Sequence, residues 1–371
     1  MIRRILRRVA MGAVCLVVVA LSSGLFYRKH LQHKVAEERA VTSPPGIDSL
    51  EPVRIGGIDQ WIEVRGQNVN NPILLVIHGG PGVAFIPLAA AFQGPWEKYF
   101  TIVEWDQRGA GKTYASNNRE LQRATMNVQQ MEQDTLDVAN YLRGRFQRKK
   151  IFVLGHSWGS LLGLWLAHEH PDLIYAYVGV GQAIIPERDE EVAFQDALQE
   201  ARRSHNEQAV KELSSIAPYP PPDRDLSNGR IAKPWEAVLL GPPTRGAAFL
   251  DPGRIVTSLV SAPEYSLADD FSFVRGQRFS LDTLLPQIIN MDLSKLGPEF
   301  RVPVFFFQGR YDPYCRPSLV QDYSQTIKAP QKDLVWFESS GHFPFFEEKQ
   351  KFADELSQRV LALAPDRQHG S

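Results

Sequence analysis

Short apolar runs alternate with helical patterns through most of this chain, and this alternation restricts the possible folds more than any other feature. The runs PILLVIHG, IFVLGH and LIYAYVGVG are almost free of charge, as is typical of strands that are buried on both faces. A helical pattern over residues 125–146 lies between the first two runs. Strands that alternate with helices predict a doubly wound, mostly parallel sheet, whose ligand sites lie at the carboxyl ends of the strands.

The alternation stops near residue 185 and resumes at VPVFFFQG. Between these points, residues 186–298 carry helical patterns and a proline-rich piece, PYPPPDRD, without a convincing parallel strand. With 371 residues, of which 43% are hydrophobic, the chain is long enough for one large domain with an insertion. We therefore predict a helical cap over 186–298, inserted into an α/β domain that comprises residues 51–185 and 299–371.

The first 26 residues predict a membrane segment. Four arginines among the first eight residues precede an uncharged run from Val9 to Phe26. As a helix this run is about 27 Å long, close to the roughly 30 Å hydrocarbon core of a bilayer. It is either a signal anchor or a cleavable signal peptide, with ALS at 20–22 as a possible cleavage site. Its length and the basic residues after it favour a retained anchor, and residues 27–50 are polar and predict a linker.

The arginines before the apolar run predict that the N-terminus stays in the cytoplasm. The folded part would then be periplasmic or extracellular and membrane-anchored, or secreted if the signal is cleaved. The 41 Lys and Arg residues nearly balance the 42 Asp and Glu residues, so no nucleic-acid partner is expected. Cys15 lies inside the apolar run and Cys315 near the other end of the chain, which excludes a disulfide between them.

The segment GHSWGS, at 155–160, follows a predicted strand and begins a predicted helix. A serine in a GxSxG pattern at this position sits on a strained strand-to-helix turn, where flanking glycines prevent clashes. The helix N-terminus behind it also favours developing negative charge. The pattern therefore predicts that Ser157 is a nucleophile.

A serine hydroxyl is a weak nucleophile unless a histidine takes its proton and a carboxylate orients that histidine. Asp312 follows the predicted strand VFFFQGRY, and His342 follows the predicted strand DLVWFESSG. Both are expected at the carboxyl ends of consecutive strands, on the same rim as Ser157 and in the chain order serine, acid, histidine. We predict His342 as general base and Asp312 as the orienting carboxylate. The alternative for Asp312 is a turn aspartate before Pro313.

The segment HGGPG, at 78–82, follows the strand PILLVIHG. Acyl transfer creates a tetrahedral oxyanion, and small residues let backbone N–H groups approach it closely. We predict that the oxyanion hole consists of the N–H of Gly80 and the N–H of Trp158, the residue after the nucleophile. The alternative is that HGGPG only reverses the chain.

Five segments together resemble the proline iminopeptidase (prolyl aminopeptidase) family of α/β hydrolases. They are HGGPG, WDQRGAGKT at 105–113, GHSWGS, GRYD ending at Asp312 and SGH ending at His342. The resemblance extends from about residue 52 to residue 364. It implies an α/β-hydrolase fold, no cofactor or metal, and removal of an N-terminal residue, often proline, from a peptide.

The resemblance also implies that carboxylates in the cap bind the free amine of the substrate. The family has a cap glutamate after a tryptophan, and Trp235-Glu236 is the matching pair in this sequence. Glu264 is the candidate for a second acidic group. For both residues the alternative is a solvated glutamate on a helix. Asp106 and Arg108 are expected to hold loops together.

Two other functions remain open. The same serine, histidine and aspartate could hydrolyse a small ester, amide or lactone, because fold and triad do not set specificity. A catalytically silent binding protein would require a damaged site, whereas every predicted element is present. The expected partners are a small peptide or ester substrate and the membrane. The sequence does not predict the oligomeric state.

Overall fold

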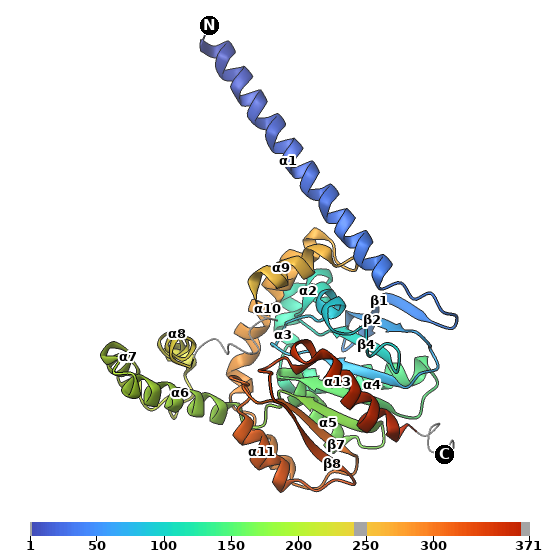
Figure 1. The fold of residues 1–371 in the computed structure, drawn as a ribbon, viewed down its shortest axis with the longest axis vertical. Helices are drawn as coiled ribbons and strands as arrows, with labels where there is room; N and C mark the ends of the chain where they lie inside the picture. Colours follow the sequence, from blue (N-terminus) through green and yellow to red (C-terminus); the bar gives the residue numbers. More distant parts are fainter. Residues whose placement is uncertain (1, 241–250, 365–371) are drawn as a thin grey trace.

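The computed structural model describes residues 2–240 and 251–364 and contains one eight-stranded sheet in the order β1-β2-β4-β3-β5-β6-β7-β8 (Figure 1). β1 and β2 form an antiparallel hairpin, and β2 also pairs antiparallel with β4. All other neighbours pair in parallel. The predicted mostly parallel sheet is confirmed. The strands are β1 (Ile47–Ile55), β2 (Ile58–Gly66), β3 (Ile73–Ile77), β4 (Thr101–Asp106), β5 (Ile151–His156), β6 (Ile174–Val180), β7 (Val304–Gly309) and β8 (Lys332–Phe337).

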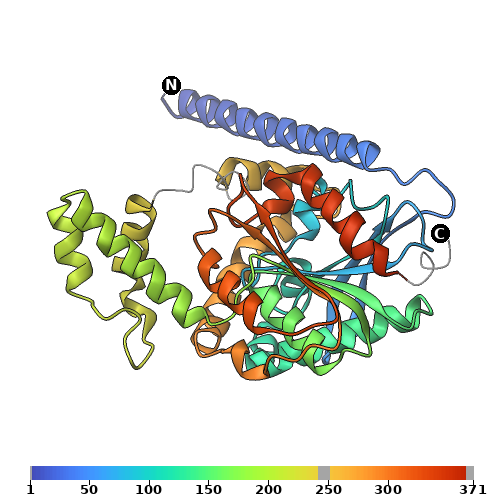
Figure 2. The ribbon, with the colours of Figure 1, turned by 60° about the horizontal axis from the view of Figure 1, so that its bottom comes forward.

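Helices cover both faces of the sheet (Figure 2). This explains the uninterrupted apolar runs, because successive side chains of a strand point to opposite faces. In β3, Leu75 belongs to one buried cluster, whereas Leu74 and Val76 belong to the other. The helices after the strands are α2 (Gly111–Ser116), α3 (Arg119–Thr125), α4 (Val128–Arg145), α5 (Trp158–Glu169), α11 (Pro317–Thr326), α12 (Pro344–Glu347) and α13 (Lys349–Glu355), with the short helices η1 (Ile86–Ala91), η4 (Leu356–Val360) and η5 (Leu361–Leu363).

The described part of the predicted cap is helical, but it divides into two bodies. α6 (Pro186–Arg203), α7 (Glu207–Ser214) and α8 (Gly229–Leu239) share a small core of their own, around Phe194 and Tyr219. α9 (Pro252–Ser261) and α10 (Leu267–Ile288) instead contribute to the cores that cover the sheet. Two short helices complete the region, η2 (Leu226–Asn228) and η3 (Leu293–Leu296).

The prediction of a linker over 27–50 is wrong for most of its length. α1 (Ile2–Glu38) is one continuous helix whose apolar half extends away from the protein while its polar half lies against α9 (Figures 1 and 2). Arg28 and Gln32 are buried there. Their side chains donate to backbone carbonyls of the α9–α10 connection, so polar residues dock the helix. β1 then begins at residue 47, inside the predicted linker.

Candidate active site

Ser157 occupies the tight turn between β5 and α5. Its φ of 54° and ψ of −120° are values that L-residues rarely adopt. The flanking glycines allow this turn. A Cβ atom on Gly155 would lie 2.4 Å from the carbonyl oxygen of Gly159, and one on Gly159 would lie 2.0 Å from the carbonyl oxygen of Ile77. The local geometry is therefore the strained strand-to-helix turn that the sequence predicts.

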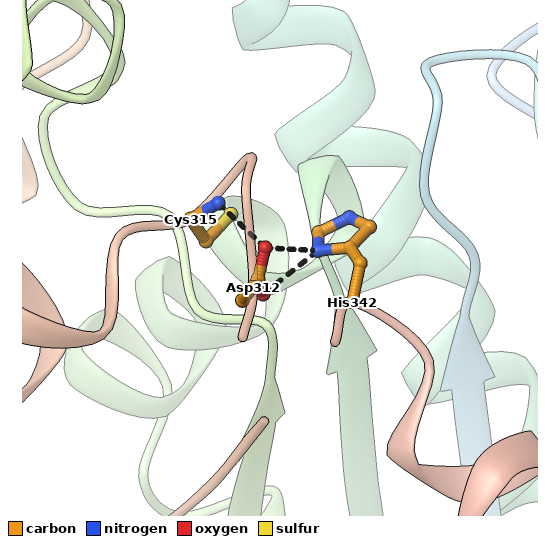
Figure 3. Close-up of side chains that lie close together, drawn as sticks. All are labelled: Asp312, Cys315 and His342. Carbon is orange, nitrogen blue, oxygen red and sulfur yellow. Dashed lines mark hydrogen bonds and ion pairs between the residues drawn. The ribbon is translucent and has the colours of Figure 1, made fainter. Parts of the chain in front are cut away.

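Asp312 and His342 lie side by side after β7 and β8 (Figure 3). The Nδ1 atom of His342 is 2.8 Å from one carboxylate oxygen of Asp312 and 3.0 Å from the other. Asp312 Oδ1 also accepts from the backbone N–H groups of Tyr314 and Cys315, and Oδ2 accepts from Gln308 Nε2. These donors stabilise the ionised carboxylate, and its orientation fixes the imidazole.

The end of β6 connects the Ser157 turn to this pair. The N–H of Ser157 donates to the carbonyl of Val180 at 3.0 Å. A Cβ on the next residue, Gly181, would lie 2.9 Å from His342 Nδ1 and 3.1 Å from Asp312 Oδ2. The structure thus brings Asp312 and His342 into direct contact and places Ser157 at the end of β5, which β6 separates from β7. Within residues 2–240 and 251–364, no hydrogen bond joins Ser157 to His342.

Neutral rings surround His342. The ring centroid of His156 lies 4.6 Å from that of His342, and its Nε2 is 2.9 Å from the His342 carbonyl oxygen. Burial lowers the pKa of His156 well below its usual value and lowers the pKa of His78 to about 4. Both rings are therefore neutral near pH 7, and neither places a positive charge beside His342. The ring of Tyr314 covers His342 from another side at 4.9 Å.

The two predicted oxyanion-hole groups face no internal acceptor: in the described part of the chain, the backbone N–H groups of Gly80 and Trp158 donate to no protein oxygen. Their segments are joined by Gln107, which sequence reasoning missed although it lies in DQRG. Gln107 Nε2 donates to the carbonyl of His78 at 2.9 Å, and its Oε1 accepts from the indole N–H of Trp158 at 3.1 Å. The sequence signal for Gln107 was its position between Asp106 and Arg108, both of which are expected from the sequence to hold loops together.

Asp106 and Arg108 hold loops together, as expected. The fully buried guanidinium of Arg108 donates to both oxygens of Asp134, at 2.9 and 3.2 Å, and to the carbonyl of Gly56. Asp106 accepts from the backbone N–H of Lys112 and from the hydroxyl of Tyr265. Burial raises the pKa of Asp106 to about 6.

Glu236 lies on α8 within a charged cluster of the cap. Lys233 Nζ is 2.9 Å from Glu236 Oε2 and 2.5 Å from Glu190 Oε2, while the buried Oε1 of Glu236 has no hydrogen-bond partner among the described residues. Burial raises the pKa of Tyr314, and the ammonium group of Lys233 lowers it. Lys233 of this cluster therefore acts electrostatically on the ring that covers His342.

Glu264 is placed differently. Its Oε1 is 2.8 Å from Arg39 Nη1, and both side chains are largely buried at the end of α1. Glu63 and Glu97 lie within 4 Å of the same guanidinium. Glu264 thus belongs to the docking contact of α1, where it pairs with Arg39. Its predicted contact with a substrate amine stays a prediction.

One group near the site has the composition of a metal site. Potential ligand atoms of Asp312, Cys315 and His342 lie within 4.8 Å of one another (Figure 3). Burial raises the pKa of the Cys315 thiol well above its usual value, which disfavours the thiolate that binds metals. The carboxylate of Asp312 already accepts four hydrogen bonds, from His342 Nδ1, from the backbone N–H groups of Tyr314 and Cys315, and from Gln308 Nε2. The group fits an orienting carboxylate better than a metal centre.

Known proteins resemble this chain in sequence and in fold. The family model for the alpha/beta hydrolase fold matches residues 72–219. The probable aminopeptidase YbaC of Bacillus subtilis is 31% identical over 311 residues, which cover 84% of this chain and 96% of that protein. The proline iminopeptidase of Neisseria gonorrhoeae is 25% identical over 330 residues, covering 84% and 95%. Among solved structures, a membrane phospholipase A superposes with a TM-score of 0.58 at 19% identity, covering 96% of this chain and 99% of that one, a likeness of fold.

Proposed function

The chain belongs to the proline iminopeptidase family of α/β hydrolases, and on that premise we propose that it is a serine aminopeptidase that removes the N-terminal residue of a peptide. The observation that carries the proposal is the buried Asp312–His342 pair beside the strained Ser157 turn. An orienting carboxylate, an imidazole and a serine on a strand-to-helix turn are the parts that acyl transfer requires.

In the proposed reaction, Ser157 Oγ attacks the scissile carbonyl carbon while His342 Nε2 accepts the hydroxyl proton. Asp312 stabilises the imidazolium that results, through the 2.8 Å contact with Nδ1. The tetrahedral oxyanion accepts from the N–H groups of Gly80 and Trp158, which have no acceptor among the described residues. The imidazolium then protonates the leaving amine, and water hydrolyses the acyl-enzyme by the same steps. A small rotation of Ser157 or His342 on substrate binding supplies the serine–histidine hydrogen bond.

Glu236 is the proposed acceptor for the free amine of the substrate. One of its oxygens is held by Lys233 and the other is buried without a partner in the described structure, which leaves an acceptor site for an ammonium group. Glu190 adds negative charge on the far side of Lys233. Glu264 is left out of this proposal because Arg39 occupies it.

We also propose that α1 anchors the protein in a membrane. The helical stretch Ala10–Glu38 contains a window with a mean hydropathy of 2.1, and that window is 0% buried. The arginines that precede it favour a cytoplasmic N-terminus and an outer hydrolase domain. Arg28 and Gln32 lie after the possible cleavage site at 20–22, so their buried contacts hold the helix end in either case; the length of the apolar run and the basic residues after it favour retention. Resistance of the membrane-bound protein to alkaline carbonate extraction, with an intact N-terminus by mass spectrometry, tests this.

The peptidase is tested with arylamides of proline, alanine and leucine beside a simple acyl ester. The full chain is used, because truncation near residue 45 would remove the docking side chains of α1. We expect arylamide hydrolysis that disappears in Ser157→Ala and falls when the substrate amine is acetylated. Hydrolysis of the ester alone, whatever the state of the amine, contradicts the peptidase proposal and leaves an esterase or lactonase of the same fold.

Glu236→Gln separates amine recognition from chemistry. It removes the negative charge and keeps the side-chain volume, so the KM for a free-amine arylamide should rise about tenfold or more, the effect of losing a charged hydrogen bond of about 1.5–3 kcal/mol. The ester should be hydrolysed as before. A matched control is Glu212→Gln, on α7 of the same body, which accepts from the indole of Trp235. Equal effects of the two variants would contradict the assignment of Glu236.

A further inference from the structure

Four large apolar side chains are exposed on α9 and on the first half of α10. Their exposed fractions are 57% for Val256, 47% for Leu267, 67% for Phe271 and 61% for Val274. We call these four residues the α9–α10 patch. Exposing apolar side chains of this size to water costs free energy, so a group of them is typical of a surface that contacts another molecule or a membrane.

The patch on α10 is an ordered stripe. Leu267, Phe271 and Val274 follow one another at intervals of four and three residues, which places them on one face of the helix. The stripe ends there. Arg278, the next residue on this face, is 86% exposed and pairs with Asp282. Apolar exposure on α10 is therefore greatest at the end that begins at Leu267, and Leu285, near the other end, is 38% exposed.

That end of α10 is the part held next to the membrane segment. Arg28, two residues after the apolar run of α1, pairs with Asp270, the residue before Phe271. Arg28 also donates to the carbonyl of Tyr265, near the start of α10. Since a helix rises 1.5 Å per residue, Arg28 lies only about 3 Å along the axis from Phe26. The start of α10 is thus fixed at the level where the apolar run of α1 ends.

We propose that the α9–α10 patch is a second membrane contact, which rests in the outer surface of the bilayer that α1 spans. This inference rests on the proposed anchoring of α1. α9 and the start of α10 lie beside the lower half of α1 on the side of the molecule from which the helix emerges (Figures 1 and 2). Lys29, three residues after the apolar run, and Arg275, one turn after Phe271, are exposed and suit the phosphate groups of lipid heads.

The bilayer suits the patch better than a second copy of the chain does. The start of α10, which carries three of the four patch residues, is joined to α1 by the Arg28–Asp270 ion pair. When α1 spans a bilayer, lipid surrounds the point where α1 meets the folded domain in every molecule. A second copy of the chain would reach the patch only at sufficient protein concentration. The consequence is that the α9 side of the protein is held against the lipid heads, so substrates approach along the membrane surface.

The test uses nitroxide labels on the full chain in vesicles of phosphatidylethanolamine and phosphatidylglycerol. Three single sites are labelled and compared for accessibility to oxygen, which partitions into lipid, and to a nickel chelate, which stays in water. The native Cys15 reports insertion of α1. Phe271→Cys, in a Cys15→Ser background, reports the patch. Gln325→Cys in the same background is the water-facing control, because Gln325 is exposed on α11, at the far side of the sheet from α1.

We expect the labels at 15 and 271 to favour oxygen and the label at 325 to favour the chelate. If 15 favours oxygen while 271 resembles 325, the anchor stands and the second contact is refuted. If 15 itself favours the chelate, both proposals fall. Dipolar broadening between labels at 271, without oxygen preference, would show a second copy on the patch and also refutes the inference. Val274→Cys repeats the test should Phe271→Cys lower expression.

Discussion

The substitution Gly181→Ala offers a direct test of the proposed catalytic pair. Gly181 has a φ of +52°, and a Cβ on it would lie 2.9 Å from His342 Nδ1. Ordinary van der Waals contact begins near 3.4 Å, so the imidazole must move by about half an ångström. That displacement acts on the nitrogen that contacts Asp312 at 2.8 Å.

The magnitude follows from these distances. Catalytic groups must be held within about 0.5 Å of the productive geometry, and a 1 Å error can cost about 100-fold. We therefore expect kcat/KM for the best substrate to fall by about 10- to 100-fold. An alanine with positive φ also costs about 1–2 kcal/mol of folding free energy. Hydrolysis rates give the first quantity, and urea unfolding gives the second.

Gly57→Ala is the matched control. Gly57 lies in the turn between β1 and β2 with a φ of +80°, and a Cβ there would meet nothing within 4 Å. The control should lose similar stability, about 1–2 kcal/mol, and keep its activity. If Gly181→Ala is as active as Gly57→Ala, then displacement of His342 does not affect the reaction, and its proposed role is wrong. If both lose activity equally, the loss reflects folding.

Three further outcomes are expected. Gln107→Leu removes the bridge between the His78 carbonyl and the Trp158 indole, so kcat should fall by about tenfold or more with little change in KM, which steady-state kinetics would show. Arg28→Met removes the ion pair with Asp270 and a charged hydrogen bond of about 1.5–3 kcal/mol, so limited proteolysis should cut near residue 40 faster than in wild type; equal rates would mean that the docking is unimportant. Burial raises the pKa of Asp189 from 3.8 to about 8, so between these pH values the folded state keeps a proton that the unfolded state releases, and stability falls as pH rises. Asp189→Asn should therefore make the slope of unfolding free energy against pH less negative, by at most about 1.4 kcal/mol per pH unit. Urea unfolding between about pH 5 and about pH 8 measures this slope.

The central part of the fold was predictable because its signals are local. Leu74 and Val76 face one buried layer and Leu75 the other, so the strand is apolar throughout and recognisable from sequence. Ser157 is recognisable because its turn requires glycines on both sides. Asp312 and His342 follow such strands, and a parallel sheet brings their ends to one edge.

The wrong linker prediction and the untested prediction for Glu264 concern the two sides of one contact. Residues 27–38 are polar and read as a linker, while Glu264 reads as a cap carboxylate that awaits a ligand. In the structure Arg39 pairs with Glu264, and the two lie 225 residues apart in the chain. From sequence alone, a polar helix face predicts exposure to solvent. Binding partners this far away in the chain produce no local sequence pattern that would predict otherwise.

The division of the cap has a similar origin. Helical periodicity in α8 and in α10 looks alike, since each buries one face. Which core that face joins depends on tertiary packing: Ala232 of α8 packs with Phe194, whereas Phe273 of α10 packs with the cluster over the sheet. The separate body that carries Glu236 is therefore a feature that only the structure reveals.

The docked half of α1 determines how far this enzyme can reach. A flexible linker of 24 residues would let the hydrolase domain wander about 25–30 Å from its anchor. A helix held by Arg28, Gln32 and Arg39 gives the domain almost no such freedom. If α1 anchors the protein as proposed, the site samples a thin layer of fixed height above the membrane and meets substrates mainly by lateral diffusion in two dimensions. For the anchored peptidase proposed above, a peptide chain presented at that height would be cleaved, whereas the same sequence displayed farther from the membrane would escape cleavage.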